Sequence, residues 1–294
     1  MTPFTKMQAI GNDFVVIEEP KNTDLAALAL RVCDRRFGIG ADGLLTYTLL
    51  NPSPQPPSLS QGRWSGKGGD RGGPVPVRAD ASSASSLVGS GQGEAGNLLF
   101  RIFNTDGSED TMCGNGLRCV VTLAVERGQV PREGIAQTRS GPVPYTVNTQ
   151  VTLTLPPPQL WEQSVPGGTT VDTGSLHTVL WPTVLPSDTT FLQDSPALEN
   201  APLFPEKTSV LWAVATAPNQ LRLRIWERGV GETLGCGTGA CAAAVVAIQT
   251  GRATRLEPVE VTSQGGTLIV SWDGLPGSSL QLTGPAATVF SGTL

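Results

Sequence analysis

The sequence predicts an α+β protein built from two similar halves, and two features of the chain lead to this prediction. The first is a series of short apolar runs, rich in β-branched and aromatic residues and separated by Gly, Pro and other turn residues. These strand-like runs cover residues 14–19, 44–50, 98–103, 151–155, 209–215, 221–226 and 267–272. Frequent short strands with few long helical patterns favour a curved or barrel-like sheet.

The second feature is a motif, Cys-Gly-x-Gly, that begins at Cys113 and again 123 residues later at Cys236. Each copy has a glutamate four residues upstream, Glu109 or Glu232, and precedes an apolar run that ends at a glycine. We therefore expect two pseudo-symmetric halves, each a curved, mostly antiparallel sheet or barrel wrapped around a central helix. The active site is expected in the cleft between them.

Three helices are expected, one over 24–36 and one directly after each motif. The helix after the second motif is apolar on nearly every side, which indicates a position inside a sheet or barrel. The first half is predicted to span 1–158 and to be completed by a C-terminal strand at 280–294, and the second half to span 159–279. More than half of residues 51–96 are Gly, Ser or Pro, which predicts a flexible low-complexity insertion in the first half.

The composition limits the function classes. A formal net charge of -5 and a pI near 5.0 argue against a nucleic acid or an anionic membrane as the main partner. No apolar run approaches the roughly 18 residues that span a bilayer, and the N-terminus lacks a secretory-signal pattern. Five cysteines are an odd number in a long chain, which does not indicate a disulfide framework. We therefore expect a soluble cytoplasmic protein.

A cysteine at the start of a helix, followed by glycines, suits proton transfer. The unpaired amides and partial positive charge of a helix N-terminus are expected to lower the thiol pKa from its free value of about 8.5. Glycines let bare N–H groups approach a carboxylate closely. Two such thiols facing one carbon suit removal of a proton from one face and delivery to the other. For either motif alone, a buried cysteine that caps a core helix is the alternative.

The remaining cysteines favour structural roles, since Cys33, Cys119 and Cys241 lie within predicted helices and are expected in the core. A zinc site formed by the two motif cysteines with Cys119 and Cys241 is an alternative. The C-x5-C and C-x4-C spacings are looser than in a usual zinc knuckle, which argues against it.

Four ordered segments of the chain resemble the diaminopimelate epimerases, which are cofactor-independent two-cysteine amino-acid epimerases. The segments are FTKMQAIGNDFVVIE at 4–18, RFGIGADGLL at 36–45, FRIFNTDGSEDTMCGNGLRC at 100–119 and WERGVGETLGCGTGACA at 226–242. The resemblance covers nearly the whole chain outside 51–96. It implies epimerisation of LL-2,6-diaminopimelate to meso-diaminopimelate by two-base proton transfer, a step in lysine and peptidoglycan precursor biosynthesis.

By this resemblance Cys113 and Cys236 are the proton-transfer residues, and His177 and Glu227 tune their pKa values. The substrate-binding residues that it implies are Asn12, Asn104, Gly114, Asn115, Ser175, Ser209, Glu227, Arg228, Gly237 and Thr238. The resemblance implies no cofactor and no metal ion. We expect a small amino acid as substrate, no nucleic-acid or membrane partner, and a homodimer.

The chain departs from the family pattern at three positions that bear on substrate identity. Ser175 and Ser209 stand where the family usually has asparagine, and Gly43 replaces a glutamine found in many members. Two short hydroxyls in place of carboxamides would loosen the grip on the far end of the substrate. Two alternatives therefore stay open: a racemase or epimerase of another amino acid on the same fold, and a non-catalytic amino-acid-binding relative.

Overall fold

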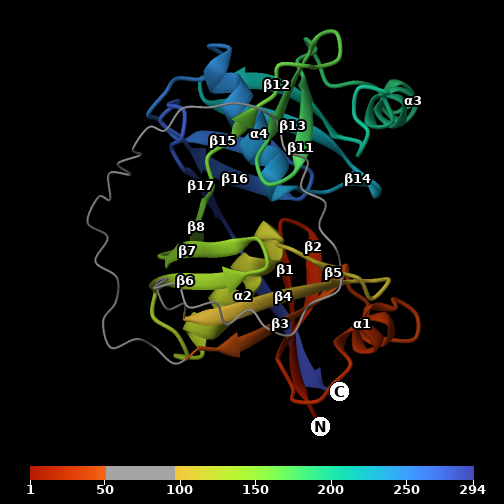
Figure 1. The fold of residues 1–294 in the computed structure, drawn as a ribbon, viewed down its shortest axis with the longest axis vertical. Helices are drawn as coiled ribbons and strands as arrows, with labels where there is room; N and C mark the ends of the chain where they lie inside the picture. Colours follow the sequence, from red (N-terminus) through yellow and green to blue (C-terminus); the bar gives the residue numbers. More distant parts are fainter. Residues whose placement is uncertain (51–96) are drawn as a thin grey trace, which may run out of the picture.

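The computed structural model describes residues 1–50 and 97–294, so the predicted insertion at 51–96 lies outside the described residues. Eighteen strands and four helices occur in the described parts of the chain. Figure 1 shows them gathered into two parts, one above the other, each with a helix at its centre. The predicted α+β class is confirmed, because most neighbouring strands run antiparallel and few helices accompany them.

We refer to β1–β9 with their helices as the first half of the chain and to β10–β18 as the second. The first half contains β1 (Pro3–Ala9), β2 (Asn12–Glu18), α1 (Leu25–Cys33), β3 (Gly43–Leu49), β4 (Leu98–Asn104), β5 (Glu109–Asp110), α2 (Gly114–Glu126), β6 (Glu133–Thr138), β7 (Gly141–Val147), β8 (Val151–Leu155) and β9 (Gln159–Leu160). The second contains β10 (Gly168–Asp172), β11 (Leu176–Leu180), α3 (Asp188–Glu199), β12 (Ser209–Ala217), β13 (Gln220–Glu227), β14 (Gly231–Thr233), α4 (Gly237–Gln249), β15 (Val259–Ser263), β16 (Gly266–Ser271), β17 (Leu280–Gly284) and β18 (Ala287–Thr293).

The strand pairings of the first half recur in the second. In the first, β2 pairs parallel with β3, β3 antiparallel with β4, and β4 antiparallel with β5 and parallel with β6. In the second, β11, β12, β13, β14 and β15 make the same sequence of pairings. The predicted repeat is therefore confirmed in the topology. In both halves the cysteine motif follows the short strand, β5 or β14, and opens the central helix.

Strands from the two halves also pair with one another. β8 runs antiparallel to β17, β9 pairs with β10, and β18 returns to pair with β1. In Figure 1 the dark blue chain crosses from the upper part to the lower part and ends near the N-terminus. The domain boundaries at residues 158, 279 and 280 stay a prediction, since β17 has partners in both halves.

The two central helices form the interior of the halves. α2 contacts strands β1–β4, β7, β8 and β18, and α4 contacts β10–β13 and β15–β17. Every residue of α4 from Gly239 to Ile248 is buried, as its apolar sequence predicts. Its alanine side chains are small, so the strands can wrap closely around the helix while the interior stays densely packed.

Two helices differ from the sequence expectation. The helix expected over 24–36 ends at Cys33. The Asp34 carboxylate accepts hydrogen bonds from the backbone amides of Arg36 and Phe37, and these bonds stabilise a turn instead of a further helical turn. α3 was not predicted. It contains Pro196 and several polar residues, and it has no clear apolar face despite the Ser187 N-cap.

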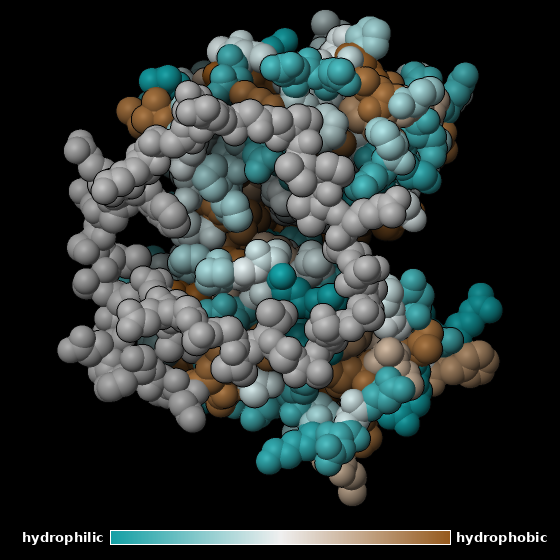
Figure 2. Space-filling model, in the orientation of Figure 1, coloured by the Kyte–Doolittle hydropathy of each residue, from teal (hydrophilic) through white to brown (hydrophobic). Residues whose placement is uncertain are grey.

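On the face shown in Figure 2, hydrophilic residues cover much of both parts, and hydrophobic residues form small separate patches among them. This distribution is ordinary for a folded protein surface, where scattered apolar residues need no partner. No helix within the described residues is long and apolar enough to cross a membrane.

Gly265, in the turn between β15 and β16, packs against the first half. A Cβ built on it would overlap the carbonyl oxygen of Ile10, and its amide donates to the Leu234 carbonyl at 2.7 Å. We expect Gly265→Ala to lower the free energy of unfolding by about 1–3 kcal/mol, because backbone atoms must move. Gly277→Ala is the control, since open space surrounds Gly277 and only its φ of +82° opposes alanine. Urea unfolding of both variants checks this, and equal losses would contradict it.

Candidate active site

Cys113 and Cys236 occupy the same position in the two central helices, since each is the N-cap residue. The sulfur of Cys113 accepts a hydrogen bond from the Gly116 amide at 3.4 Å, and that of Cys236 accepts one from Gly239 at 3.4 Å. Cys113 is partly exposed and Cys236 is buried. Both sulfurs therefore lie where the free amides of a helix N-terminus favour an anion.

The starts of the two helices lie against one another. The side-chain nitrogen of Asn115 donates to the carbonyl oxygen of Gly235, at the entrance to α4, at 3.3 Å. Leu282 of β17 adjoins both helices, because a Cβ built on Gly114 or Gly237 would lie 3.6 or 3.1 Å from its Cδ2. The two cysteine-bearing ends thus meet at one place between the halves.

One carboxylate, Glu227 at the end of β13, acts on both thiols. The Thr233 hydroxyl donates to its Oε1 at 2.6 Å, and burial raises the pKa of Glu227. Burial raises the pKa of Cys113 to about 11, and the negative charge of Glu227 adds to this increase. Burial also raises the pKa of Cys236 well above its ordinary value, again with a contribution from the charge of Glu227, which accepts a hydrogen bond from this thiol.

The direction of these shifts corrects the expectation that the helix N-termini lower the thiol pKa values. The Gly116 amide and the Arg118 guanidinium do favour the Cys113 thiolate, but the loss of hydration outweighs them in the ligand-free site. Both thiols are therefore protonated at neutral pH until a ligand changes their surroundings.

His177, predicted to tune the cysteine pKa values, reaches Cys236 through Thr238. Its Nε2 lies 3.0 Å from the Thr238 hydroxyl oxygen, which lies 3.4 Å from the Cys236 sulfur. Burial, with a contribution from the positive charge of Arg228, lowers the pKa of His177 to about 3, so the ring is neutral. A proton on Nε2 would direct the Thr238 hydroxyl hydrogen toward the sulfur.

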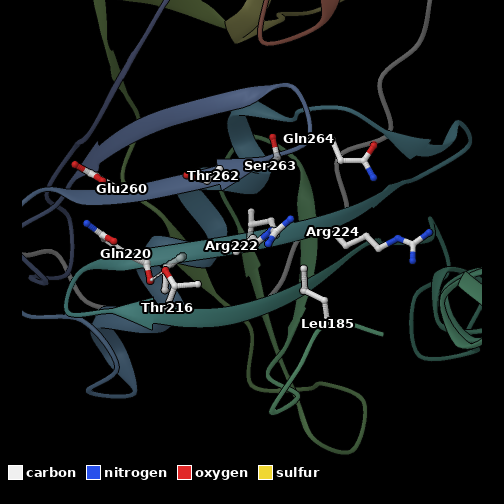
Figure 3. Close-up of a pocket in the computed structure, with 11 residues that line it drawn as sticks. Leu185, Thr216, Gln220, Arg222, Arg224, Glu260, Thr262, Ser263 and Gln264 are labelled. Atoms are coloured by element: carbon white, nitrogen blue, oxygen red, sulfur yellow. Dashed lines mark hydrogen bonds between the residues drawn. The ribbon is translucent and has the colours of Figure 1, made fainter. Parts of the chain in front are cut away.

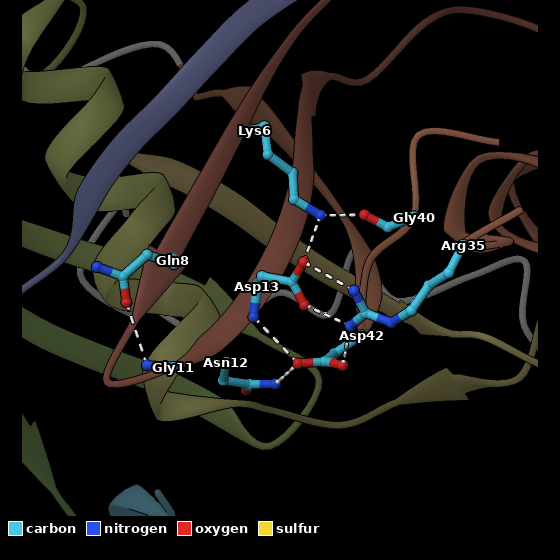
Figure 4. Close-up of polar contacts among 8 residues, drawn as sticks. All are labelled: Lys6, Gln8, Gly11, Asn12, Asp13, Arg35, Gly40 and Asp42. Carbon is cyan, nitrogen blue, oxygen red and sulfur yellow. Dashed lines mark hydrogen bonds and ion pairs between the residues drawn. The ribbon is translucent and has the colours of Figure 1, made fainter. Parts of the chain in front are cut away.

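Asn12, the first residue of β2, belongs to the charged network drawn in Figure 4. Its side-chain nitrogen donates to Asp42 at 2.6 Å, and Arg35 bonds both Asp42 and Asp13 at 2.6 Å. Burial disfavours the Asp13 carboxylate, but hydrogen bonds from Arg35 and Lys6 outweigh it and lower the pKa of Asp13 to about 2. The network fixes the Asn12 carboxamide with its oxygen directed away from Asp42.

The other predicted binding residues lie at the ends of neighbouring strands. Asn104 ends β4, and its side chain bonds a serine of the following turn at 3.1 Å. Ser209 is the first residue of β12 and is 3% exposed. Its hydroxyl accepts a hydrogen bond from the backbone amide of Arg228 at 3.1 Å. The Arg228 guanidinium donates to the Glu206 carbonyl at 3.0 Å. Ser175 lies in the turn between β10 and β11.

The predicted residues therefore form two groups. Hydrogen bonds or charge interactions join the first group, which comprises Cys113, Cys236, Glu227, His177 and Thr238. The second group is held by hydrogen bonds to other residues and comprises Asn12, Asn104, Ser209 and Arg228. The charge of Arg228 acts on His177 and connects this group to the first. The charge of Asp42 acts on Glu227, so the network around Asn12 lies beside the cysteine group.

Two other candidate sites are a cavity away from the cysteine pair and the zinc site that would include it. A cavity of about 320 Å³, drawn in Figure 3, lies beside β13 and β15, and its walls include Arg222, Arg224 and Glu260. None of the predicted site residues lines it. The zinc alternative lacks a ligand set, since no three His, Cys, Asp or Glu side chains of residues 1–50 and 97–294 are grouped as metal ligands.

The chain is similar over nearly its whole length to curated diaminopimelate epimerases. It is 33% identical to the diaminopimelate epimerase of Microcystis aeruginosa over an aligned length of 321 residues, gaps included. The alignment covers 99% of this chain and 98% of the relative. It is 35% identical to that of Gluconobacter oxydans over 308 residues, which cover 99% and 98%. The chain belongs to the diaminopimelate epimerase family. The family model, described as diaminopimelate epimerase, matches residues 169–289, and the protein is an isomerase.

Solved structures with little sequence identity share the fold of this diaminopimelate epimerase family member. A hydroxyproline epimerase from Agrobacterium vitis, with bound trans-4-hydroxy-L-proline, is 15% identical with a TM-score of 0.58, over 99% of this chain and 91% of that one. A phenazine biosynthesis protein of the PhzF family from Bacillus anthracis is 14% identical with a TM-score of 0.61, over 100% and 98%. These likenesses concern the fold alone.

The glutamates upstream of each cysteine form matched clamps in this member of the diaminopimelate epimerase family. Arg101 of β4 donates to both carboxylate oxygens of Glu109 in β5, at 2.8 and 3.1 Å. Arg224 of β13 does the same to Glu232 in β14, at 2.7 and 3.1 Å. Each clamp ties the short strand that leads into a cysteine motif to the sheet beside it. The repeated glutamates thus have a structural explanation.

We expect Glu109→Gln and Glu232→Gln each to lower the free energy of unfolding by about 1 kcal/mol, because each substitution removes a bidentate ion pair with an arginine. Glu232→Gln should have the larger effect, since the Arg224 side chain is less exposed than that of Arg101, 13% against 29%. Glu162→Gln, at an exposed position, is the control. Urea unfolding midpoints check the prediction, and a control as destabilised as the clamp variants would refute it.

Three side-chain contacts at the candidate site of this diaminopimelate epimerase family member were not predicted from the sequence. The Thr238 hydroxyl, the Asp42 carboxylate and the Arg118 guanidinium each contact a predicted site residue. For Arg118 a signal existed, because a charged residue stands in the apolar run after the first motif. Asn12 is 30 residues from Asp42 and His177 is 61 residues from Thr238, so no local pattern identified these two contacts.

Proposed function

We propose that the protein epimerises LL-2,6-diaminopimelate to meso-diaminopimelate by proton transfer between Cys113 and Cys236. The observation that carries this proposal is the meeting of two equivalent helix N-caps, both cysteine, under the influence of one carboxylate, Glu227. One sulfur, as a thiolate, removes the α-proton. The opposite sulfur, as a thiol, returns a proton to the other face, and the two exchange roles in the reverse direction.

The helix starts can also bind the reacting end of the substrate. The first amides of α2 and α4, at Gly114, Asn115, Gly237 and Thr238, lack intrahelical partners and suit an α-carboxylate. They would stabilise negative charge that spreads onto this carboxylate as the proton leaves. The α-ammonium group brings a positive charge beside the sulfurs, which lowers a thiol pKa that burial alone raises.

Hydrogen exchange in D2O tests the proposal. The protein is incubated with LL-diaminopimelate, meso-diaminopimelate and a panel of other amino acids, and deuterium at the α-carbon is measured by NMR together with the stereoisomer ratio. We expect deuterium incorporation and inversion with diaminopimelate alone. Exchange into another amino acid and none into diaminopimelate would overturn the choice of substrate.

Ser209 favours one alternative, a racemase of another amino acid. Its hydroxyl accepts the Arg228 amide and its side chain is buried, so it offers little to the far end of a long substrate. The same panel distinguishes this alternative, because a shorter amino acid would then exchange faster. A non-catalytic amino-acid-binding protein would give no exchange with any member of the panel.

The proposed activity would place the protein in the biosynthesis of lysine and peptidoglycan precursors, in the cytoplasm. We also propose that it acts as a homodimer. Light scattering coupled to gel filtration tests this, and a mass near the 30.7 kDa of one chain would overturn it.

A further inference from the structure

Arg118 lies one turn into α2 and is the largest fully buried side chain of the described residues. Burying a guanidinium is costly unless hydrogen bonds and an opposite charge compensate for lost hydration. All of its partners are neutral: the Gly114 carbonyl at 3.3 Å, the Asn115 side-chain oxygen at 2.8 Å and the Pro285 carbonyl at 3.3 Å. Within residues 1–50 and 97–294, no carboxylate forms an ion pair with it.

The hydrogen bonds of Arg118 link three segments. The side-chain oxygen of Asn115 accepts a hydrogen bond from the Arg118 guanidinium. Its side-chain nitrogen donates a hydrogen bond to the carbonyl oxygen of Gly235, just before α4. Pro285 lies between β17 and β18, where the chain crosses back to the first half. These hydrogen bonds run from Pro285 through Arg118 and Asn115 to Gly235. They therefore hold the start of α2, the entrance to α4 and the segment that crosses between the halves together.

Glycines leave the space that the guanidinium occupies. A Cβ built on Gly284 would lie 3.2 Å from Nε of Arg118, and one on Gly237 would lie 3.9 Å from Nη1. The first is closer than ordinary contact, so a larger residue at 284 would displace the guanidinium. The guanidinium thus lies between the crossing strand and the first residue of α4.

Only one half of the molecule carries a positive charge at this position. The equivalent position 123 residues later is Cys241, so only α2 carries an arginine there. The ionisable groups that act on Arg118 are Cys113 and Cys119 from α2 and Cys241 from α4. Nη1 of Arg118 donates to the carbonyl of Gly114, the residue after Cys113, at 3.3 Å, and the positive charge favours the Cys113 thiolate. Glu227 opposes ionisation of both Cys113 and Cys236.

We propose that Arg118 is a positioning residue that sets the relative placement of the two cysteines through Asn115 and makes Cys113 the sulfur that ionises more readily. This inference rests on the proposed function. A structural core arginine would account for the burial and the hydrogen bonds, but it would not predict that the two thiols respond differently to its removal.

Two variants separate the positioning effect from the charge effect. Arg118→Met keeps the apolar stem and removes the charge, whereas Arg118→Lys keeps the charge and loses the planar fork that bonds three acceptors. For both we would measure kcat and KM in each direction by α-deuterium exchange, over pH 6 to 10. Alkylation of each cysteine by iodoacetamide, followed by peptide mass spectrometry, is measured from pH 7 to pH 12, because burial raises the pKa of Cys113 to about 11. It reports ionisation without requiring turnover.

In Arg118→Met, we expect kcat to fall by about 100-fold, since misplacement of about 1 Å costs this much, with KM changed less. The midpoint for Cys113 alkylation should move to higher pH, and that for Cys236 should move less. In Arg118→Lys, the Cys113 midpoint should stay near the parent value while kcat still falls. Equal movement of both midpoints, or none, would overturn the charge effect, and parent-like kcat in Arg118→Lys would overturn the positioning effect.

Arg127→Met is the matched control. Arg127 follows the other end of α2 and donates to the Tyr47 hydroxyl at 3.1 Å and the Thr5 hydroxyl at 2.9 Å. Its loss should reduce thermal stability and leave both alkylation midpoints unchanged. If Arg118→Met does not fold, Arg118→Lys and Arg118→Gln provide the comparison. A parent without exchange would refute the proposed function, while the alkylation midpoints would still decide the charge effect.

Discussion

Replacing Cys113 or Cys236 with alanine is expected to lower the rate of diaminopimelate epimerisation by roughly 10²- to 10⁴-fold, the usual contribution of a positioned acid or base. Each sulfur lies at its own helix start, so neither can take over the task of the other at the opposite face of the carbon. Inversion requires a sulfur on each face of the α-carbon, so either variant should lose it. The measurement is the stereoisomer ratio of diaminopimelate with time.

The two variants should differ in what they retain. With one sulfur left, a proton can still leave and return on a single face, so each variant should exchange the α-proton of one stereoisomer without inverting it. Cys113→Ala and Cys236→Ala should prefer opposite stereoisomers. The control is Cys33→Ala in α1, which packs in a separate core cluster and should leave exchange unchanged. If both variants exchanged the same stereoisomer, the two-sided arrangement would be refuted.

The position of the two cysteines could be predicted from the sequence because the features that create it are local. An N-cap followed by glycines and an apolar run is written within about fifteen residues, and both copies form the helices that this pattern predicts. The short strands were predictable for the same reason, since alternating or continuous apolar runs bounded by turn residues formed β4, β8, β12, β13 and β16.

The site chemistry was less predictable because it depends on contacts between distant segments. The upstream glutamates mark the repeat in the sequence, but only their partners Arg101 and Arg224 show that they tie the short strands to the sheets. Burial, which raises the pKa of both motif thiols, depends on how completely the two halves enclose them. α3 belongs to the same category, because its buried Glu199 bonds Trp226 and Gly229 and so supports the turn after Glu227.

The buried thiols also predict strong sensitivity to alkaline pH. Burial raises the pKa of Cys33 and Cys113 to about 11 and that of Cys119 and Cys241 to about 12. A thiol has a pKa near 8.5 in the unfolded chain, so the folded state binds these protons more tightly. Their contribution to stability is complete below about pH 8.5 and is lost as pH rises through the folded-state values.

We therefore expect the free energy of unfolding to fall steeply between pH 9 and pH 12, by about 3 kcal/mol for each thiol shifted by two pKa units. Urea unfolding at pH 7, 9, 10 and 11, with a reductant present, measures this. Cys33→Ala isolates one contribution: it should be less stable than the parent at pH 7, because a buried atom is lost, and should lose less stability on going to pH 11. A parent whose stability is constant from pH 8 to pH 11 would show that the thiols ionise equally well in both states.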